Sequence, residues 1–378
     1  PGEVVVGKVT DGRLNALQII EPSGDRVRPP CPHFSTCGGC SLQHASDRFV
    51  QDWKAGLVRE ALAAVGLEAP VTEVVTSPAQ SRRRATLAAR RTKKGATVGL
   101  HRRASATIIE IPDCRLLHPD LMAVITALRE LTVAGATRKG EVAFALTRAA
   151  AGVDVAATGG KALSGALGAK LASIAARHGL ARLSWDGQAV VQAAPPVQMF
   201  GGVAVTPPPG AFLQATEHGQ AAMQAAVARA LAPANSVVDL FAGCGTFCLP
   251  LAGAATVHAV EGDADMLDAL KAGWRRATGL KQLTSEARDL FRRPLLAAEL
   301  NRFAAAVIDP PRAGAQAQAH QLAVSTIDTI AHVSCNPVTF ARDARLLCDR
   351  GFQIEAITIV DQFRWSGHVE LVAAMSRS

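Results

Sequence analysis

The sequence contains no tyrosine, and aromatic residues make up only 4% of its 378 residues. Any stacking on a nucleobase would therefore depend on a small number of side chains. No uninterrupted apolar run reaches the ~18 residues that a membrane span requires, and no charged-then-apolar signal segment opens the chain. These absences predict a soluble, cytoplasmic protein without a membrane partner.

Positive charge exceeds negative charge, with 40 lysines and arginines against 32 acidic residues. Such a balance favours a polyanionic partner, nucleic acid first, although a merely basic soluble protein has the same net charge. Residues 82–103 concentrate the charge on predicted strands, where it can contact RNA phosphates or form a solvated face. The basic residues of this segment are Arg82, Arg83, Arg84, Arg90, Arg91, Lys93, Lys94, Arg102 and Arg103.

The eight cysteines are unevenly distributed, and three of them lie in the stretch CPHFSTCGGC as Cys31, Cys37 and Cys40. This crowding indicates a metal or cluster site rather than a disulfide framework. Four of the remaining cysteines lie in the C-terminal part of the chain, which leaves Cys114 as the natural fourth ligand. Zinc and an iron–sulfur cluster both use four thiolates, so the chemistry alone leaves these two open, beside four buried cysteines without a ligand.

The pattern of apolar residues divides the chain into three parts. Residues 1–30 show two short strands and a turn-rich linker, and residues 31–200 combine the cysteine segment with an α+β pattern. A proline- and glycine-rich stretch, 195–212, marks the next boundary. In residues 201–378 short strands alternate with helices, which predicts an α/β fold: a mostly parallel Rossmann-like sheet that ends in an antiparallel hairpin.

Three motifs follow successive strands of that predicted sheet. DLFAGCGTF places a glycine turn at Gly243, and VEGD places Glu261 at the end of the next strand, where a carboxylate can bind a ribose. IDPPR holds Asp309 and Arg312 at the same edge because the two prolines stiffen the backbone. This combination is the pattern of class I methyltransferases that use S-adenosylmethionine. Many of these enzymes methylate exocyclic nitrogens and have an aromatic residue after the two prolines, so Arg312 at this position argues against that activity.

The stretch HVSCNPVTFARD places Cys335 at the end of another strand, directly before a predicted helix. A free cysteine is often a small buried hydrophobe, but a helix N-terminus lowers a thiol pKa and favours the nucleophilic thiolate. Glu370, in GHVE, is either solvated or functional. A thiolate that adds to carbon 6 of uracil activates carbon 5 toward a methyl donor, and a base then removes the carbon 5 proton. Cys335 and Glu370 fit these two roles.

The C-terminal part resembles the RNA uracil-5-methyltransferase family in FLQ, DLFAGCGTF, VEGD, IDPPR, SCNPVTFARD and GHVE, in the family's order between residues 212 and 370. The resemblance implies that Cys335 is the nucleophile, that Glu370 is the general base, and that S-adenosylmethionine is the methyl donor. It also implies a cofactor site that is lined by Gln214, Phe241, Gly243, Thr246, Glu261, Asp289 and Asp309.

Members of this family that act on ribosomal RNA carry a [4Fe–4S] cluster with this cysteine spacing, whereas transfer-RNA members generally lack it. The resemblance therefore implies a cluster on Cys31, Cys37, Cys40 and Cys114, with a role in structure or RNA binding. Residues 1–30 resemble the second half of a TRAM domain, a small RNA-binding β-barrel. We expect a monomeric uridine C5-methyltransferase that acts on 23S ribosomal RNA. The alternatives are a transfer-RNA uridine C5-methyltransferase and a zinc-stapled, non-catalytic RNA-binding protein.

Overall fold

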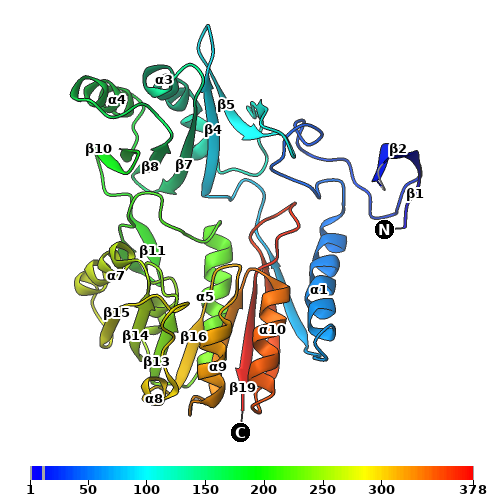
Figure 1. Ribbon diagram of the computed structural model, residues 1–378, viewed down its shortest axis with the longest axis vertical. Coiled ribbons are helices and arrows are strands. Elements are labelled where there is room, and N and C mark those ends of the chain that lie inside the picture. The colour runs from blue at the N-terminus through cyan, green and yellow to red at the C-terminus, as the bar shows by residue number, and fades with distance from the viewer. Residues whose placement is uncertain (1, 11–12, 378) are drawn as a thin grey trace.

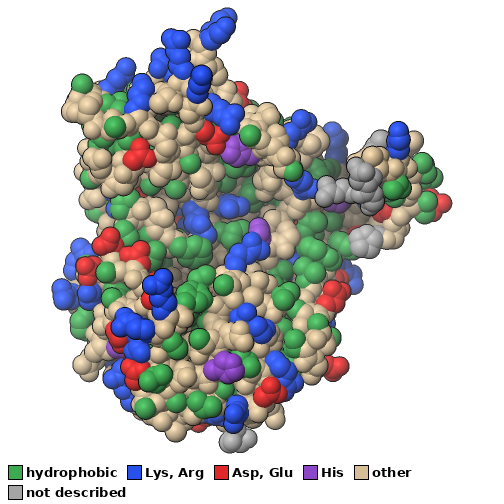
Figure 2. Space-filling view, in the orientation of Figure 1, with side chains coloured by type: hydrophobic (Ala, Val, Ile, Leu, Met, Phe, Trp, Pro, Cys, Tyr) green, Lys and Arg blue, Asp and Glu red, His purple; other side chains and the backbone are tan. Residues whose placement is uncertain are grey.

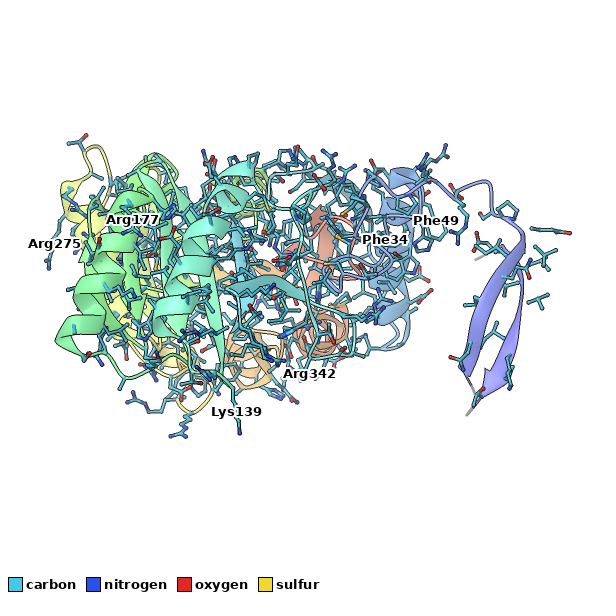
Figure 3. All side chains as sticks on the ribbon, turned by 90° about the horizontal axis from the view of Figure 1, so that it is seen from above. Phe34, Phe49, Lys139, Arg177, Arg275 and Arg342 are labelled. Carbon is cyan, nitrogen blue, oxygen red and sulfur yellow. The ribbon has the colours of Figure 1, made fainter. Side chains whose placement is uncertain are left out.

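The computed structural model describes residues 2–10 and 13–377, and its N-terminal hairpin stands apart from the body of the molecule (Figures 1 and 3). The hairpin pairs β1 (Val4–Thr10) with β2 (Arg13–Glu21) in antiparallel register. Three valines of β1, Val4, Val6 and Val9, are exposed. Two strands do not close a barrel, so the TRAM-like character of this segment is based on its sequence alone.

The central unit is a seven-stranded sheet with two main helices on one face (Figure 1). Apolar side chains of the sheet and of both helices form one buried cluster around Trp185. The strand order is β10-β9-β8-β7-β4-β5-β6, with β4 (Arg84–Arg91), β5 (Ala96–His101), β6 (Ile108–Ile109), β7 (Glu141–Ala149), β8 (Gly152–Thr158), β9 (Arg182–Trp185) and β10 (Gln188–Gln192). The helices are α2 (Pro119–Ala123), α3 (Ile125–Gly135) and α4 (Gly165–Arg177). This is the α+β arrangement that the sequence predicts.

The C-terminal unit is an eight-stranded sheet whose middle strands run parallel. Its order is β15-β14-β13-β16-β17-β19-β18-β3. The strands are β3 (Val71–Thr76), β13 (Ser236–Leu240), β14 (Thr256–Glu261), β15 (Leu283–Ala287), β16 (Ala305–Ile308), β17 (Thr329–Ser334), β18 (Gln353–Asp361) and β19 (Leu371–Ser376). Strand β19 lies antiparallel between β17 and β18, which confirms the predicted terminal hairpin.

Helices cover both faces of this sheet, as a doubly wound α/β fold requires. One face carries α1 (Asp47–Ala63), α8 (Ala297–Leu300), α9 (Gln316–Val324) and α10 (Pro337–Cys348), which share one apolar cluster. Two further clusters involve α5 (Glu217–Leu231), α6 (Cys248–Leu251) and α7 (Ala264–Arg276). A small hairpin of β11 (Gln198–Phe200) and β12 (Val203–Val205) packs against α7. Among the described residues, none of the helices has both the length and the hydropathy of a membrane span.

The segment from α1 to β3 differs from its predicted place. The sequence assigns it to the central unit, whereas β3 pairs in parallel with β18 at the edge of the C-terminal sheet. Helix α1 packs against α10 beside it (Figure 1). A buried ion pair of 2.6 Å joins Lys54 of α1 to Asp361 at the end of β18. Residues 47–76 therefore extend the C-terminal unit. Strand β18 has a free edge with which β3 pairs, and no local sequence pattern indicates this pairing.

Candidate active site

A cavity of about 700 Å³ lies at the carboxyl edge of the C-terminal sheet. Parallel strands end at this edge, so the side chains that follow them converge there. The structure brings together every residue that the sequence analysis assigned to cofactor binding or catalysis. These residues are Gln214, Phe241, Gly243, Thr246, Glu261, Asp289, Asp309, Cys335 and Glu370.

The turn after β13 is tightly constrained. Phe241 has a positive φ of 67°, which is rare for a residue with a side chain. The N–H groups of Phe241 and Ala242 both donate to the carbonyl of Val260, at 2.9 and 3.0 Å, and this anchors the turn to β14. A Cβ at Gly245 would lie 2.7 Å from the Leu249 side chain, so only glycine fits there. The turn consequently presents its backbone to the cavity.

Glu261 is held in place by backbone donors. Its carboxylate accepts N–H bonds from Gly243 at 2.9 Å, Gly262 at 2.7 Å and Asp263 at 3.0 Å. The carboxylate therefore joins the glycine turn to the start of α7 while it lines the cavity. Sequence reasoning assigned it to a ribose, and the structure adds that it also fixes the turn.

An aromatic pair forms another wall of the cavity. The rings of Phe241 and Phe291 lie 5.4 Å apart, centroid to centroid, and Phe291 is half exposed. Asp289 accepts the N–H of Phe291 at 3.0 Å and so orients this segment. Sequence analysis did not select Phe291. Its position two residues after Asp289, in a chain with few aromatics, was the available signal.

Cys335 lies between β17 and α10, as predicted, but its acidity is opposite to the expectation. Burial, together with the negative charges of Glu370 and Asp309, raises the pKa of the Cys335 thiol to about 11. The prediction of a lowered pKa from the helix N-terminus was wrong. The helix does begin there, because Asn336 accepts the Val338 N–H at 3.1 Å and caps it. The effects of burial and of the nearby carboxylates on the thiol pKa outweigh that of the helix dipole.

Glu370 lies directly before β19 and is almost fully buried. Burial first, and then the charge of Asp309, raises the pKa of Glu370 to about 8, while a hydrogen bond from Gln362 and the charges of Arg84 and Arg312 act in the opposite direction. An acid whose pKa lies close to neutral can exchange protons at physiological pH. The structure thus places a proton-transfer group beside a thiol.

The basic segment 82–103 serves two different purposes. Arg83 is 2% exposed and donates to the carbonyl of Gln214 at 3.0 Å and to Gln220 at 2.7 Å, so it cannot contact phosphate and the prediction for this residue was wrong. Arg84 stacks on Phe212 and Arg82 on Phe363, with guanidinium-to-ring distances of 4.5 and 5.3 Å. Both rings line the cavity.

The other basic residues of the segment are more accessible, and blue side chains gather at the tip of the β4–β5 hairpin in Figure 2. Those that are exposed are Arg90, Lys93, Lys94, Arg102 and Arg103. Arg90 pairs with Glu141 at 2.9 Å. The hairpin therefore presents a positive surface above the cavity-bearing unit, which suits a polyanion.

Cys31, Cys37, Cys40 and Cys114 line a second, smaller cavity, and none of them forms a disulfide. The Gly39 N–H donates to the Cys37 sulfur at 3.4 Å. Burial raises the pKa of the Cys114 thiol, and the backbone N–H groups of Leu117 and Leu116 act in the opposite direction. Such donors stabilise a thiolate. The donor set therefore suits a thiolate-bound metal group. Within the described part of the chain, however, no three His, Cys, Asp or Glu side chains are grouped closely enough to hold a metal ion.

Comparison with known proteins places the chain among RNA-modifying enzymes. Residues 209–378 match the family model described as tRNA (Uracil-5-)-methyltransferase. The chain is 45% identical to an uncharacterized RNA methyltransferase of Mesorhizobium japonicum, over all of this chain and 91% of that protein. It is 34% identical to the 23S rRNA (uracil(1939)-C(5))-methyltransferase RlmD of Dichelobacter nodosus, over 96% of this chain and 87% of that protein.

A solved structure has the same fold. It is the Pyrococcus abyssi tRNA (uracil-54, C5)-methyltransferase in complex with S-adenosyl-L-homocysteine, with a TM-score of 0.72, 22% sequence identity, and coverage of 99% of this chain and 93% of that one. The fold and the site at its strand ends thus define a class I S-adenosylmethionine-dependent methyltransferase. The chain belongs to the RNA uracil-5-methyltransferase family and is an RNA (uracil-C5)-methyltransferase.

Proposed function

We propose that the protein transfers the methyl group of S-adenosylmethionine to carbon 5 of a uridine in 23S ribosomal RNA, through a covalent adduct between Cys335 and carbon 6. The observation that carries the proposal is the shared cavity, in which Cys335 and Glu370 line the same space as the residues assigned to the cofactor. The 34% identity with a 23S ribosomal RNA enzyme over nearly the whole chain supports the choice of RNA.

The covalent route follows from the chemistry of uracil. The Cys335 thiol gives its proton to water, and its sulfur bonds to carbon 6. The electron pair of the carbon 5–carbon 6 double bond moves into an enolate with the neighbouring carbonyl, which makes carbon 5 nucleophilic. Carbon 5 then attacks the methyl group of the sulfonium. The bond between that methyl group and sulfur breaks, and S-adenosylhomocysteine is the second product. Glu370 removes the carbon 5 proton, the electron pair reforms the carbon 5–carbon 6 double bond, and the thiolate departs. Glu370 suits this step because its raised pKa makes it a stronger base than an exposed carboxylate.

The cofactor would be held by the other residues of the cavity. Glu261 lines the cavity at the end of β14, a position that suits a ribose diol, and Phe241 and Phe291 offer aromatic faces to an adenine. Gln214, Gly243, Thr246, Asp289 and Asp309 complete this assignment. The cofactor supplies the electrophilic methyl group, and these residues orient it toward the thiol side of the cavity.

We further propose that Cys31, Cys37, Cys40 and Cys114 hold a [4Fe–4S] cluster. Four thiols without a disulfide around one apolar cavity, one of them accepting the Gly39 N–H, support this. A single zinc ion would need its thiolates about 3.8 Å apart, given Zn–S bonds of about 2.3 Å. A cubane instead spreads four thiolates over four iron atoms, so the metal content of the purified protein decides between the two.

The proposed reaction is tested with Glu370→Gln and Cys335→Ala. With RNA and cofactor present, Glu370→Gln should accumulate a protein–RNA adduct that survives denaturation, because the thiolate cannot be eliminated. Cys335→Ala should lose turnover and still bind S-adenosylhomocysteine. A fully active Cys335→Ala enzyme would refute the covalent route.

The substrate and the cluster are tested separately. The protein is incubated with equal amounts of a 23S ribosomal RNA fragment and a transfer-RNA transcript, and 5-methyluridine should form in the ribosomal RNA. Methylation of the transfer RNA alone would instead favour a transfer-RNA methyltransferase activity, as the Pyrococcus abyssi protein is named for. Protein purified without oxygen should be brown and contain iron and sulfide. A colourless protein with one zinc would exclude the cluster.

A further inference from the structure

The loop of residues 288–296, between β15 and α8, carries two residues of the cofactor assignment, Asp289 and Phe291, and both line the cavity. Such a loop lacks the repeating hydrogen bonds of a helix or a strand, so other contacts must keep it in one conformation. Asp289 is exposed and Phe291 is half exposed. Burial therefore does not fix these two side chains.

The first half of the loop is a turn with its own hydrogen bonds. The Asp289 carboxylate accepts the N–H groups of Phe291 at 3.0 Å and of Arg292 at 3.3 Å. The Asp289 carbonyl accepts the N–H of Arg293 at 2.8 Å. These bonds all lie within residues 289–293, so they shape the turn without attaching it to the fold. Leu290 attaches one side of the turn by packing in the apolar core.

Arg288 binds the other side of the turn, where the chain leaves it. Its Nε donates to the carbonyl of Arg293 at 2.7 Å, and its Nη2 donates to the carbonyl of Pro294 at 2.9 Å. Its Nη1 and Nη2 also donate to the Glu299 carboxylate, at 2.7 and 3.1 Å, and a longer bond of 3.4 Å goes to Glu286. A bidentate pair of a guanidinium with a carboxylate is strong and has a defined geometry.

Both members of this pair are fixed to regular elements. The Arg288 N–H donates to the carbonyl of Glu261 at 2.8 Å, which ties the residue to the end of β14. Glu299 belongs to α8 and accepts the Leu296 N–H at 2.8 Å. The Arg288 side chain is 13% exposed and that of Glu299 is 37% exposed, so solvent screens the pair only in part. The guanidinium group therefore joins the loop to β14 and to α8.

From these contacts we infer that Arg288 is a positioning residue, which holds the loop of residues 288–296 in the conformation that binds the cofactor. The inference rests on the proposed placement of the cofactor against Asp289 and Phe291. Arg288 itself lines the cavity, so a direct contact of its guanidinium group with the cofactor is the competing explanation. Glu299 distinguishes the two explanations, because it stands outside the cavity wall and bonds the guanidinium group from behind the loop.

The test measures S-adenosylhomocysteine binding by calorimetry in Arg288→Met, Glu299→Gln and the double variant. Arg288→Met keeps an unbranched side chain without donors and should weaken binding about tenfold. Glu299→Gln turns one carboxylate oxygen into a donor, which breaks the bidentate pair and should weaken binding several-fold. The double variant should bind as weakly as Arg288→Met alone, because both changes break the same unit. Wild-type affinity in Glu299→Gln would overturn the positioning role and favour the direct contact.

Kinetics and hydrogen exchange locate the effect. In Arg288→Met the KM for S-adenosylmethionine should rise about tenfold while kcat stays within about twofold of the wild-type value, since the loop binds the cofactor and carries no reacting group. The amides of residues 290–296 should exchange faster in both single variants. Arg288→Lys keeps the charge without the planar fork and should fall between the wild type and Arg288→Met. A fall in kcat at an unchanged KM would overturn the inference.

Two further variants make the result specific. Arg345→Met is the matched control, because Arg345 of α10 forms a similar pair with Asp349, at 2.9 and 2.6 Å, and neither residue lines the cavity. It should leave cofactor binding unchanged. Phe291→Ala separates the two hypotheses. Unchanged binding in Phe291→Ala would refute the proposed placement of the cofactor, whereas weakened binding there, beside wild-type affinity in Arg288→Met and Glu299→Gln, would refute only the role of Arg288.

Discussion

The N–H of Ser41 donates to the carbonyl oxygen of Trp365, 2.8 Å away, and the N–H of Leu42 donates to the same oxygen at 3.0 Å. Ser41 directly follows Cys40, and Trp365 lies in the loop that leads from β18 to Glu370. Arg364 in the same loop donates to Asp47 at the start of α1. The cysteine segment thus holds the loop that carries the proposed base.

This contact predicts that damage to the cysteine segment reaches the active site. The variant Cys40→Ser removes one proposed cluster ligand, so the cysteine segment should be held less firmly and its bonds to the Trp365 carbonyl should open more often. The amides of residues 41–42 and 363–369 should then exchange with deuterium faster than in the wild type. Hydrogen exchange with mass spectrometry measures this. Cys348→Ser, which alters a half-buried cysteine in α10, should leave both stretches unchanged. Equal exchange of residues 363–369 in the two variants would show that the contact does not stabilise the loop.

The buried pair of Lys54 and Asp361 makes a prediction about stability. Their side chains are 0% and 1% exposed and lie 2.6 Å apart. Lys54→Met leaves a buried carboxylate without its partner and should lower the free energy of unfolding by about 3–5 kcal/mol. The double variant Lys54→Met/Asp361→Leu should recover much of that loss, because no charge remains buried. Urea unfolding of the two variants measures the difference, and a wild-type midpoint for Lys54→Met would contradict the prediction.

Sequence reasoning located the cavity well because its residues follow strands, and strand ends of a parallel sheet meet at one edge. It placed β3 in the wrong unit, because the partner of an edge strand is chosen by tertiary packing and leaves no local signal. It gave Cys335 the wrong direction of pKa shift, since a helix start is visible in SCNP whereas the burial and the carboxylates around the thiol are not.

The raised pKa of Glu370 predicts how activity depends on pH. The carboxyl loses its proton only near pH 8 in the folded protein, so the basic form that accepts the carbon 5 proton becomes scarcer as the pH falls below 8. We expect kcat/KM to fall about tenfold per pH unit between about pH 7.5 and 6, and to level off above pH 8 unless the Cys335 thiol, with its pKa of about 11, limits the rate. Measurements at saturating cofactor give the profile. A flat profile from pH 6 to 8 would exclude Glu370 as the titrating base.

The exposed tip of the β4–β5 hairpin predicts where RNA is bound outside the cavity. Lys93 and Lys94 are exposed there, and their ammonium groups can reach phosphates without any contact to a base. Lys93→Gln/Lys94→Gln should weaken RNA binding and reduce the slope of log K against log salt by about 1 to 2, since up to two phosphate contacts are lost. The kcat at saturating RNA should stay close to the wild-type value, because neither lysine lines the cavity. Lys170→Gln, an exposed lysine of α4, is the matched control, and an equal loss of affinity in both proteins would show that the hairpin tip has no special part in binding.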